Sequence, residues 1–62
     1  MKQYCQVKLQ TNKYSDEGVT IGDIGYILEI YDENNYEVEF SDGNGTTILL
    51  RSFSKEELEF IE

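Results

Sequence analysis

The 62-residue chain contains no histidine and no proline, and Cys5 is its only cysteine. A single cysteine cannot form a disulfide within the chain. Without histidine it also does not supply the ligand set of a usual zinc site. Imidazole is the commonest base beside a nucleophile, and Cys5 falls in a segment where we expect it to act as a small hydrophobe. The sequence therefore predicts no enzyme activity, no catalytic residue, no metal and no cofactor.

Basic residues are also scarce, because five lysines and arginines stand against thirteen acidic residues, a net charge of −8. Nucleic acids and anionic membranes are bound largely through lysine and arginine, so we expect neither as a partner. A basic protein is the partner that such a charge attracts, with fast and salt-sensitive association. The alternative is that the acidic surface serves only to keep the chain soluble.

Long apolar runs are absent, and no stretch approaches the ~18 residues that a membrane-spanning helix requires. The opening residues Met1–Gln6 carry no apolar segment typical of a signal peptide. With a lone cysteine, these features predict a cytoplasmic protein. The length predicts one domain, residues 1–62, with little core of its own.

The first part of the chain predicts a strand and a long loop. Residues Tyr4–Leu9 alternate in polarity, as in a half-buried strand. Its inward side chains would be Cys5, Val7 and Leu9. The polar stretch Gln10–Thr20 follows no period and is long for a connection between strands. Tyr14 is the large apolar residue in its middle, and it either anchors the loop on the fold or lies exposed as a contact for a partner.

A hairpin follows, entered through Gly22 and Gly25, which suit a tight turn or a close approach of backbones. Residues Ile24–Tyr31 are apolar on both faces and predict the central strand. We expect Ile27 and Ile30 in the core, with a bulge or a strong coil of the strand between them. Tyr26, Leu28 and Tyr31 would be partly exposed.

After a turn at Asp32–Asn35, residues Tyr36–Phe40 alternate without fault. We expect Tyr36, Val38 and Phe40 to point inward and Glu37 and Glu39 to point outward. A second turn at Ser41–Gly45 contains two glycines and two Asx residues, which favour turns.

The last part of the chain predicts two short strands, Thr46–Arg51 and Leu58–Ile61, and the second could pair with the first strand of the chain. Between them, Ser54–Glu57 has the capping-box pattern of a helix start, although only one helical turn fits. Five strands without proline predict an all-β fold, a small SH3-like five-stranded barrel with one short helical turn before the last strand.

These elements carry a family resemblance from about Val7 to Glu62. The motifs Gly22-Asp-Ile-Gly25, Tyr36-Glu-Val-Glu-Phe40 and Ser54-Lys-Glu-Glu-Leu58 resemble those of short, acidic bacterial proteins that carry a domain of unknown function. The resemblance implies an SH3-like barrel. The chain is also similar, more loosely, to SH3-like accessory subunits of cyanobacterial photosynthetic complexes. Those subunits dock through basic residues that this chain lacks.

The long loop and the outer face of the hairpin are the surfaces on which we expect a partner to bind. The candidate partner-binding residues are Tyr14, Asp16, Glu17, Tyr31, Asp32, Glu33, Glu37 and Glu39. Aromatic side chains supply contact area and carboxylates steer a basic partner. The alternative is an ordinary solvated acidic face.

Two functions fit this surface. The first is a small acidic protein–protein binding module, such as an immunity protein or antitoxin that sterically blocks a basic active site. The alternative is a structural accessory subunit with no inhibitory role, whose contact would be apolar and formed by residues such as Tyr26, Leu28 or Phe53. An exposed sheet edge also offers a second copy a place to pair, which would give a homodimer.

Overall fold

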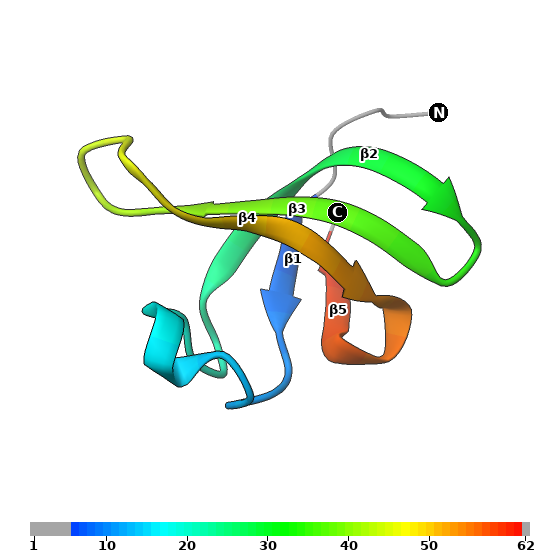
Figure 1. Ribbon diagram of the computed structural model, residues 1–62, viewed down its shortest axis with the longest axis horizontal. Helices are drawn as coiled ribbons and strands as arrows, with labels where there is room; N and C mark the ends of the chain where they lie inside the picture. The colour runs from blue at the N-terminus through cyan, green and yellow to red at the C-terminus, as the bar shows by residue number, and fades with distance from the viewer. Residues whose placement is uncertain (1–5, 62) are drawn as a thin grey trace.

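The computed structural model describes residues 6–61, which form one antiparallel sheet of five strands in the order β4-β3-β2-β1-β5 (Figure 1). The strands are β1 (Gln6–Leu9), β2 (Ile24–Asp32), β3 (Asn35–Ser41), β4 (Thr47–Ser54) and β5 (Leu58–Ile61), with two short 3₁₀ turns, η1 (Ser15–Glu17) and η2 (Lys55–Glu57). The fold is all-β as predicted and is consistent with a small SH3-like barrel. The expected start of the first strand, with Cys5, lies outside the described residues.

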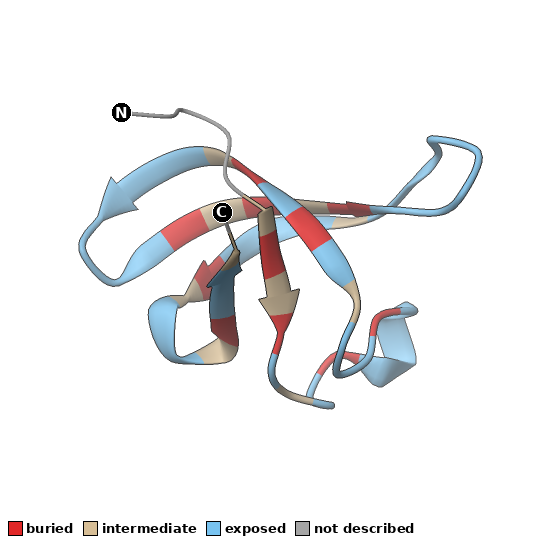
Figure 2. Cartoon of the chain, turned by 180° about the vertical axis from the view of Figure 1, so that it is seen from behind, coloured by how far each residue is buried: buried red, intermediate tan, exposed pale blue. Residues whose placement is uncertain are grey.

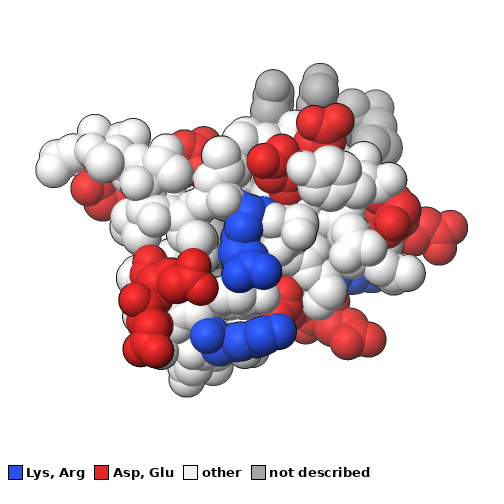
Figure 3. All heavy atoms as spheres, viewed as in Figure 1, with Lys and Arg blue, Asp and Glu red and all other residues white. Residues whose placement is uncertain are grey.

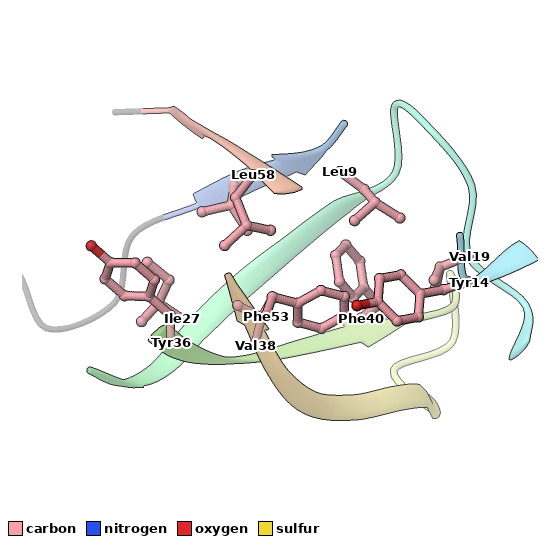
Figure 4. Close-up of a cluster of buried hydrophobic side chains, with 10 residues drawn as sticks. Leu9, Tyr14, Val19, Ile27, Tyr36, Val38, Phe40, Phe53 and Leu58 are labelled. Carbon is pink, nitrogen blue, oxygen red and sulfur yellow. The ribbon is translucent and has the colours of Figure 1, made fainter. Parts of the chain in front are cut away.

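The sheet curls so that β1 and β5 lie on one side of the buried side chains and β3 and β4 on the other (Figure 4). The core consists of Val7, Leu9, Tyr14, Val19, Ile27, Tyr36, Val38, Phe40, Phe53 and Leu58. At its centre the ring of Phe53 meets the edges of its neighbours, at 4.9 Å from Tyr14 and 5.4 Å from Phe40 between ring centroids. Such edge-to-face contacts add to the free energy gained by burying the rings.

Strand β3 follows the predicted alternation along its whole length. Tyr36, Val38 and Phe40 are buried, and Figure 2 shows the buried and less buried bands that result. Glu37 and Glu39 lie on the opposite, outer face and are half-buried between their neighbours. The alternation of polar and apolar residues was sufficient to predict the orientation of these side chains, because one face of this strand is covered and the other is not.

Strand β2 contains the predicted bulge, but one of its two expected core residues is wrong. Ile27 pairs with Val38 and Glu29 with Glu37, so Leu28 is an extra residue between them. Ile27 is buried, whereas Ile30 is 45% exposed. Ile30 pairs with Tyr36 and lies beyond Tyr26, the last residue of β2 that pairs with β1 among the described residues.

The two glycines at the entrance of the hairpin, Gly22 and Gly25, are required for different structural reasons. Gly22 has a φ of 97° in a turn that the N–H of Asp23 closes by donating to the carbonyl of Thr20. Gly25 lies where the ring of Phe40 passes over the sheet, and a Cβ at this position would lie 2.8 Å from that ring. Both are therefore structural, one through a left-handed conformation and one through close packing.

Strand β4 is longer than the predicted Thr46–Arg51 and ends at Ser54. Phe53, which we expected as an apolar contact for a partner, is 1% exposed in the core, so that expectation is wrong. The alternation of apolar and polar residues is interrupted in β4, because the charged Arg51 occupies an inward position opposite Val38. Its guanidinium lies over the Tyr14 ring, 4.7 Å from the centroid, while the Arg51 side chain stays 44% exposed.

The last elements follow the prediction. Ser54 and Glu57 form the expected capping box, in which the N–H of Ser54 donates to Oε1 of Glu57 at 3.0 Å. The short turn η2 then reverses the chain, and β5 pairs antiparallel with β1, Leu58 lying opposite Leu9. Both of these leucines are buried, so the last strand completes the core.

Candidate functional site

The outer face of β2, β3 and β4 carries apolar and acidic side chains side by side. Cross-strand partners point to the same face, and the register places Tyr26, Glu39 and Leu50 in one row. Tyr26 is 45% and Leu50 47% exposed, on either side of the half-buried Glu39. The hydroxyl of Thr47 donates a hydrogen bond to the carboxylate of Glu39, which holds that carboxylate at the surface.

A second row, nearer the hairpin end, contains two carboxylates that face each other. Glu29 pairs with Glu37, and Glu37 pairs with Ser52. Like charges opposite one another destabilise a sheet. The Tyr31 hydroxyl lies against this pair and donates a hydrogen bond to Oε1 of Glu37 at 3.2 Å. Desolvation of the hydroxyl, that hydrogen bond and the charges of Glu37 and Glu29 raise the pKa of Tyr31 above its usual value, so it remains a neutral donor.

We call these six residues the outer-face patch: Tyr26, Glu29, Tyr31, Glu37, Glu39 and Leu50. The patch contains three large exposed side chains, those of Tyr26, Tyr31 and Leu50, which offer contact area to a partner. Its other three members are glutamates. No lysine or arginine takes part in either of its cross-strand rows. In the described part of the chain, no ion pair neutralises its three carboxylates, so they can attract a cation of a partner.

At the tip of the hairpin, the Asp32 carboxylate is occupied by the turn itself. Its Oδ1 accepts hydrogen bonds from the N–H of Asn34 at 2.7 Å and from the side chain of Asn35 at 3.1 Å. These hydrogen bonds, that of the Asn34 backbone first, hold the pKa of Asp32 below its usual value. Asp32 thus shapes the turn, while Glu33 beside it is exposed.

Tyr14 is buried, so its predicted role as an exposed contact for a partner is wrong and the alternative, a loop anchor, is confirmed. The side chain is 4% exposed and packs on Phe53. Its hydroxyl donates to Oε2 of Glu57 at 2.7 Å. Desolvation, this hydrogen bond and the charge of Glu57 raise the pKa of Tyr14 above its usual value, although the charge of Arg51 acts in the opposite direction.

Asp16 and Glu17 are exposed in η1, which lies at the other side of the molecule from the tip of the β2–β3 hairpin (Figure 1). Glu17 is already near a cation, with its Oε2 3.9 Å from the guanidinium of Arg51. Figure 3 shows the resulting mixture, with basic side chains in the middle of this view and acidic ones around them. The predicted residues of η1 and of the hairpin therefore do not form one surface.

Besides the expected Ser54 backbone, the structure gives Glu57 two partners that the sequence did not indicate, Tyr14 and Lys13. Glu57 accepts hydrogen bonds from Tyr14 and from the Ser54 backbone, and its Oε2 lies 3.5 Å from Nζ of Lys13. Desolvation alone would raise the pKa of Glu57, but these hydrogen bonds and the charge of Lys13 outweigh it, so the pKa lies below its usual value. The capping-box pattern located Glu57, whereas no local signal pointed to a tyrosine far away in the sequence.

The described part of the chain offers neither a metal site nor a membrane-spanning helix. Across residues 6–61, no group of three carboxylate or cysteine side chains is placed to hold a metal ion. None of the helical segments in this range has the length or apolar character to cross a membrane.

Comparison with known proteins gives a family. Neither curated proteins nor solved structures yielded a match to the chain. A family model, described as a domain of unknown function (DUF4926), matches residues 6–60. Because this match covers nearly the whole chain, the protein belongs to the DUF4926 family.

Proposed function

We propose that this protein is a small acidic protein–protein binding module that acts through the outer-face patch. The observation that carries the proposal is the row of Tyr26, Glu39 and Leu50, in which two exposed side chains flank a carboxylate on the outer face of the sheet. Aromatic and apolar anchors supply most of the free energy at protein interfaces. Carboxylates at such a surface attract and orient a basic partner.

An inhibitory role fits this chemistry, as in an immunity protein or antitoxin that covers the basic active site of an enzyme. The net charge of −8 speeds the encounter and opposes nucleic acids and anionic membranes as partners. The proposal places the protein in the cytoplasm, where a lone cysteine stays reduced. Its mechanism is steric blockade after electrostatic steering.

A second candidate is a structural accessory subunit, which a different observation favours. Ile24, Tyr26 and Leu50 are all large, apolar in character and exposed. A contact made chiefly through such side chains would depend little on salt. The two candidates therefore differ in how association responds to ionic strength.

The test is to purify a tagged form of the chain from a native lysate, identify the bound protein and measure association rates with that purified partner. For the binding module, we expect the association rate to fall steeply between about 50 and about 500 mM NaCl. Glu37→Lys should slow association about tenfold at low salt, since it reverses a charge in the patch. Glu37 lies opposite Glu29, so the new lysine gains a partner and folding should be preserved.

The matched control is Glu56→Lys, which makes the same change of net charge in η2, away from the patch. If Glu37→Lys and Glu56→Lys slow association equally, only the net charge matters and the patch is not the binding site. A rate independent of salt, with affinity lost in Leu50→Ala, would instead support the accessory subunit.

A further inference from the structure

One long edge of the sheet is open along β4. Within residues 6–61 this strand pairs only with β3, whereas the other edge strand, β5, is only four residues long and carries Glu59. Edge strands expose main-chain hydrogen-bonding groups, and proteins protect them with short length, charge or proline. Strand β4 is eight residues long, lacks proline, and has Arg51 as its one charged residue, which is turned toward Tyr14. The pairing of β4 with β3 has a register shift between Phe40 and Ser41, where Ser41 lies opposite Thr47 at the start of β4.

The hydrogen-bond register shows which groups of β4 point away from β3. The N–H of Lys55 donates to the carbonyl of Asn34 at 2.8 Å. Residues that bond to a neighbouring antiparallel strand alternate with residues that do not. Counting back from Lys55, Phe53 and Arg51 bond to β3, while the main-chain groups of Ser52 and Leu50 point toward the open edge.

Some of these edge groups are already satisfied within the chain. The N–H of Ser54 donates to Glu57, and the carbonyl of Ser52 accepts from Nε of Arg51 at 3.2 Å. The turn η2 therefore ends the open edge at its C-terminal side. Among the described residues, the N–H of Ser52 and both main-chain groups of Leu50 have no main-chain partner in a neighbouring strand, and the Leu50 side chain beside them is 47% exposed.

We propose that this edge accepts an extended, basic segment of the partner protein as a sixth strand beside Leu50 and Ser52. Main-chain hydrogen bonds would give such an added strand its affinity, and side-chain complementarity its specificity. The inference deepens the proposed function and rests on it, because it names the part of the partner that is bound and the way it is held.

The charge next to the edge selects a basic segment. Glu39 lies opposite Leu50 and Glu37 opposite Ser52, on the outer face of the adjacent strand. An added strand would lie about 10 Å from β3, a span that a lysine or arginine side chain and a glutamate side chain cover together. A second copy of this chain is a poorer occupant, because it brings another net charge of −8 and the same two glutamates.

The edge can be tested with a synthetic probe whose chemistry is known. The probe is a capped peptide of about eight residues that alternates lysine and valine, and its control alternates glutamate and valine. Binding is followed on the ¹⁵N-labelled full chain by NMR titration and amide hydrogen exchange. We expect exchange at Leu50 and Ser52 to slow about tenfold or more with the lysine peptide and to stay unchanged with the glutamate peptide.

Ser52→Pro removes the outward N–H of one edge residue at a position where the ladder to β3 does not need it. It should weaken binding of the lysine peptide about tenfold or more, while the matched Ser52→Ala, which keeps the N–H, should change it less than about twofold. The exchange measurement on the unsubstituted chain decides the matter even if the proline variant fails to fold.

Three results would overturn the inference. One is a lysine peptide that shifts resonances of Glu37 and Glu39 without protecting Leu50 and Ser52. That result would leave the proposed function standing, because the patch would then bind without the edge. Another is equal protection by both peptides, which would remove the preference for a basic segment. The third is a dimer of the chain at micromolar concentration that Ser52→Pro dissociates, since the edge would then take a second copy.

Discussion

At the scale of single residues, the contact between Tyr14 and Glu57 holds the long loop before β2 against the rest of the fold. The Tyr14 ring packs on Phe53, its hydroxyl bonds to a half-buried carboxylate, and the Arg51 guanidinium covers its face. A loop of this length gains order only if some of its side chains lose water. Tyr14 supplies that burial, and Glu57 satisfies the one polar group that is buried with it.

Replacing Tyr14 with phenylalanine isolates the hydrogen bond from the packing. The ring remains, but Glu57 loses one of its donors, so the free energy of unfolding should fall by about 1 to 3 kcal/mol. Urea unfolding at neutral pH measures this. As a control, Tyr26→Phe removes an exposed hydroxyl that accepts a weak bond from Gln6, and it should cost less than about 0.5 kcal/mol. Equal effects of the two variants would show that the Tyr14 hydroxyl has no special role.

Glu57 should also make stability depend on acid pH. Its pKa is lower in the folded chain than in the unfolded chain, so the charged form stabilises the fold. This contribution is complete above the unfolded pKa of about 4.3 and is lost as the pH falls through the lower folded pKa. We expect the stability difference between the natural chain and Glu57→Gln to shrink between pH about 6 and about 3. The other carboxylates cancel in this difference, and a gap that stays constant would contradict the prediction.

At the scale of elements, the central hairpin shows how far polarity alone predicts a strand. For β3, the predicted orientation of each residue from Tyr36 to Phe40 was correct, because one face of the strand is covered throughout. In β2, Ile27 was correct and Ile30 was wrong, although both lie on the inner face. Whether an inner residue is covered depends on which side chains lie across the curled sheet from it, and no local pattern encodes that.

The predictions for strand β4 and for the long loop were wrong for a related reason. We expected Phe53 as an apolar contact for a partner and Tyr14 as either a loop anchor or an exposed contact, and the structure buries both. The two burials depend on each other, because the Tyr14 ring packs on Phe53 and the Arg51 guanidinium covers the face of Tyr14. Such a contact between distant segments is visible only once the fold is known.

Gly25 provides a test of packing between elements. A Cβ there would lie 2.8 Å from the Phe40 ring and 2.9 Å from the Glu39 carbonyl, so Gly25→Ala should overpack the join between β2 and β3. We expect a loss of about 1 to 3 kcal/mol in the free energy of unfolding, measured in urea. Gly43→Ala is the matched control, because nothing lies within 4 Å of a Cβ at that position. It should change stability by less than about 0.5 kcal/mol.

At the scale of the whole molecule, the candidate surface was only partly predictable. Alternation in β3 placed Glu37 and Glu39 outward, and Tyr31 does join them, through its hydrogen bond to Glu37. Leu50 and Glu29 were missed as members because the patch is built by register across three strands, with a bulge that shifts one of them. Sequence predicts which face a residue takes within a strand, while the neighbours of that face require the pairing.

The same surface should make the isolated protein more stable in salt. Thirteen acidic residues stand against five basic ones, and Glu29 faces Glu37 directly, so repulsion opposes the folded state. Raising NaCl from about 20 to about 500 mM screens that repulsion and should increase the free energy of unfolding, measured in urea because urea is uncharged. Glu29→Gln removes one half of the facing pair. It should raise stability at low salt by about 0.2 to 1 kcal/mol and gain less from added salt than the natural chain. If stability falls with salt, the ion pairs outweigh the repulsion, and the acidic surface then has no cost in folding that binding a basic partner could relieve.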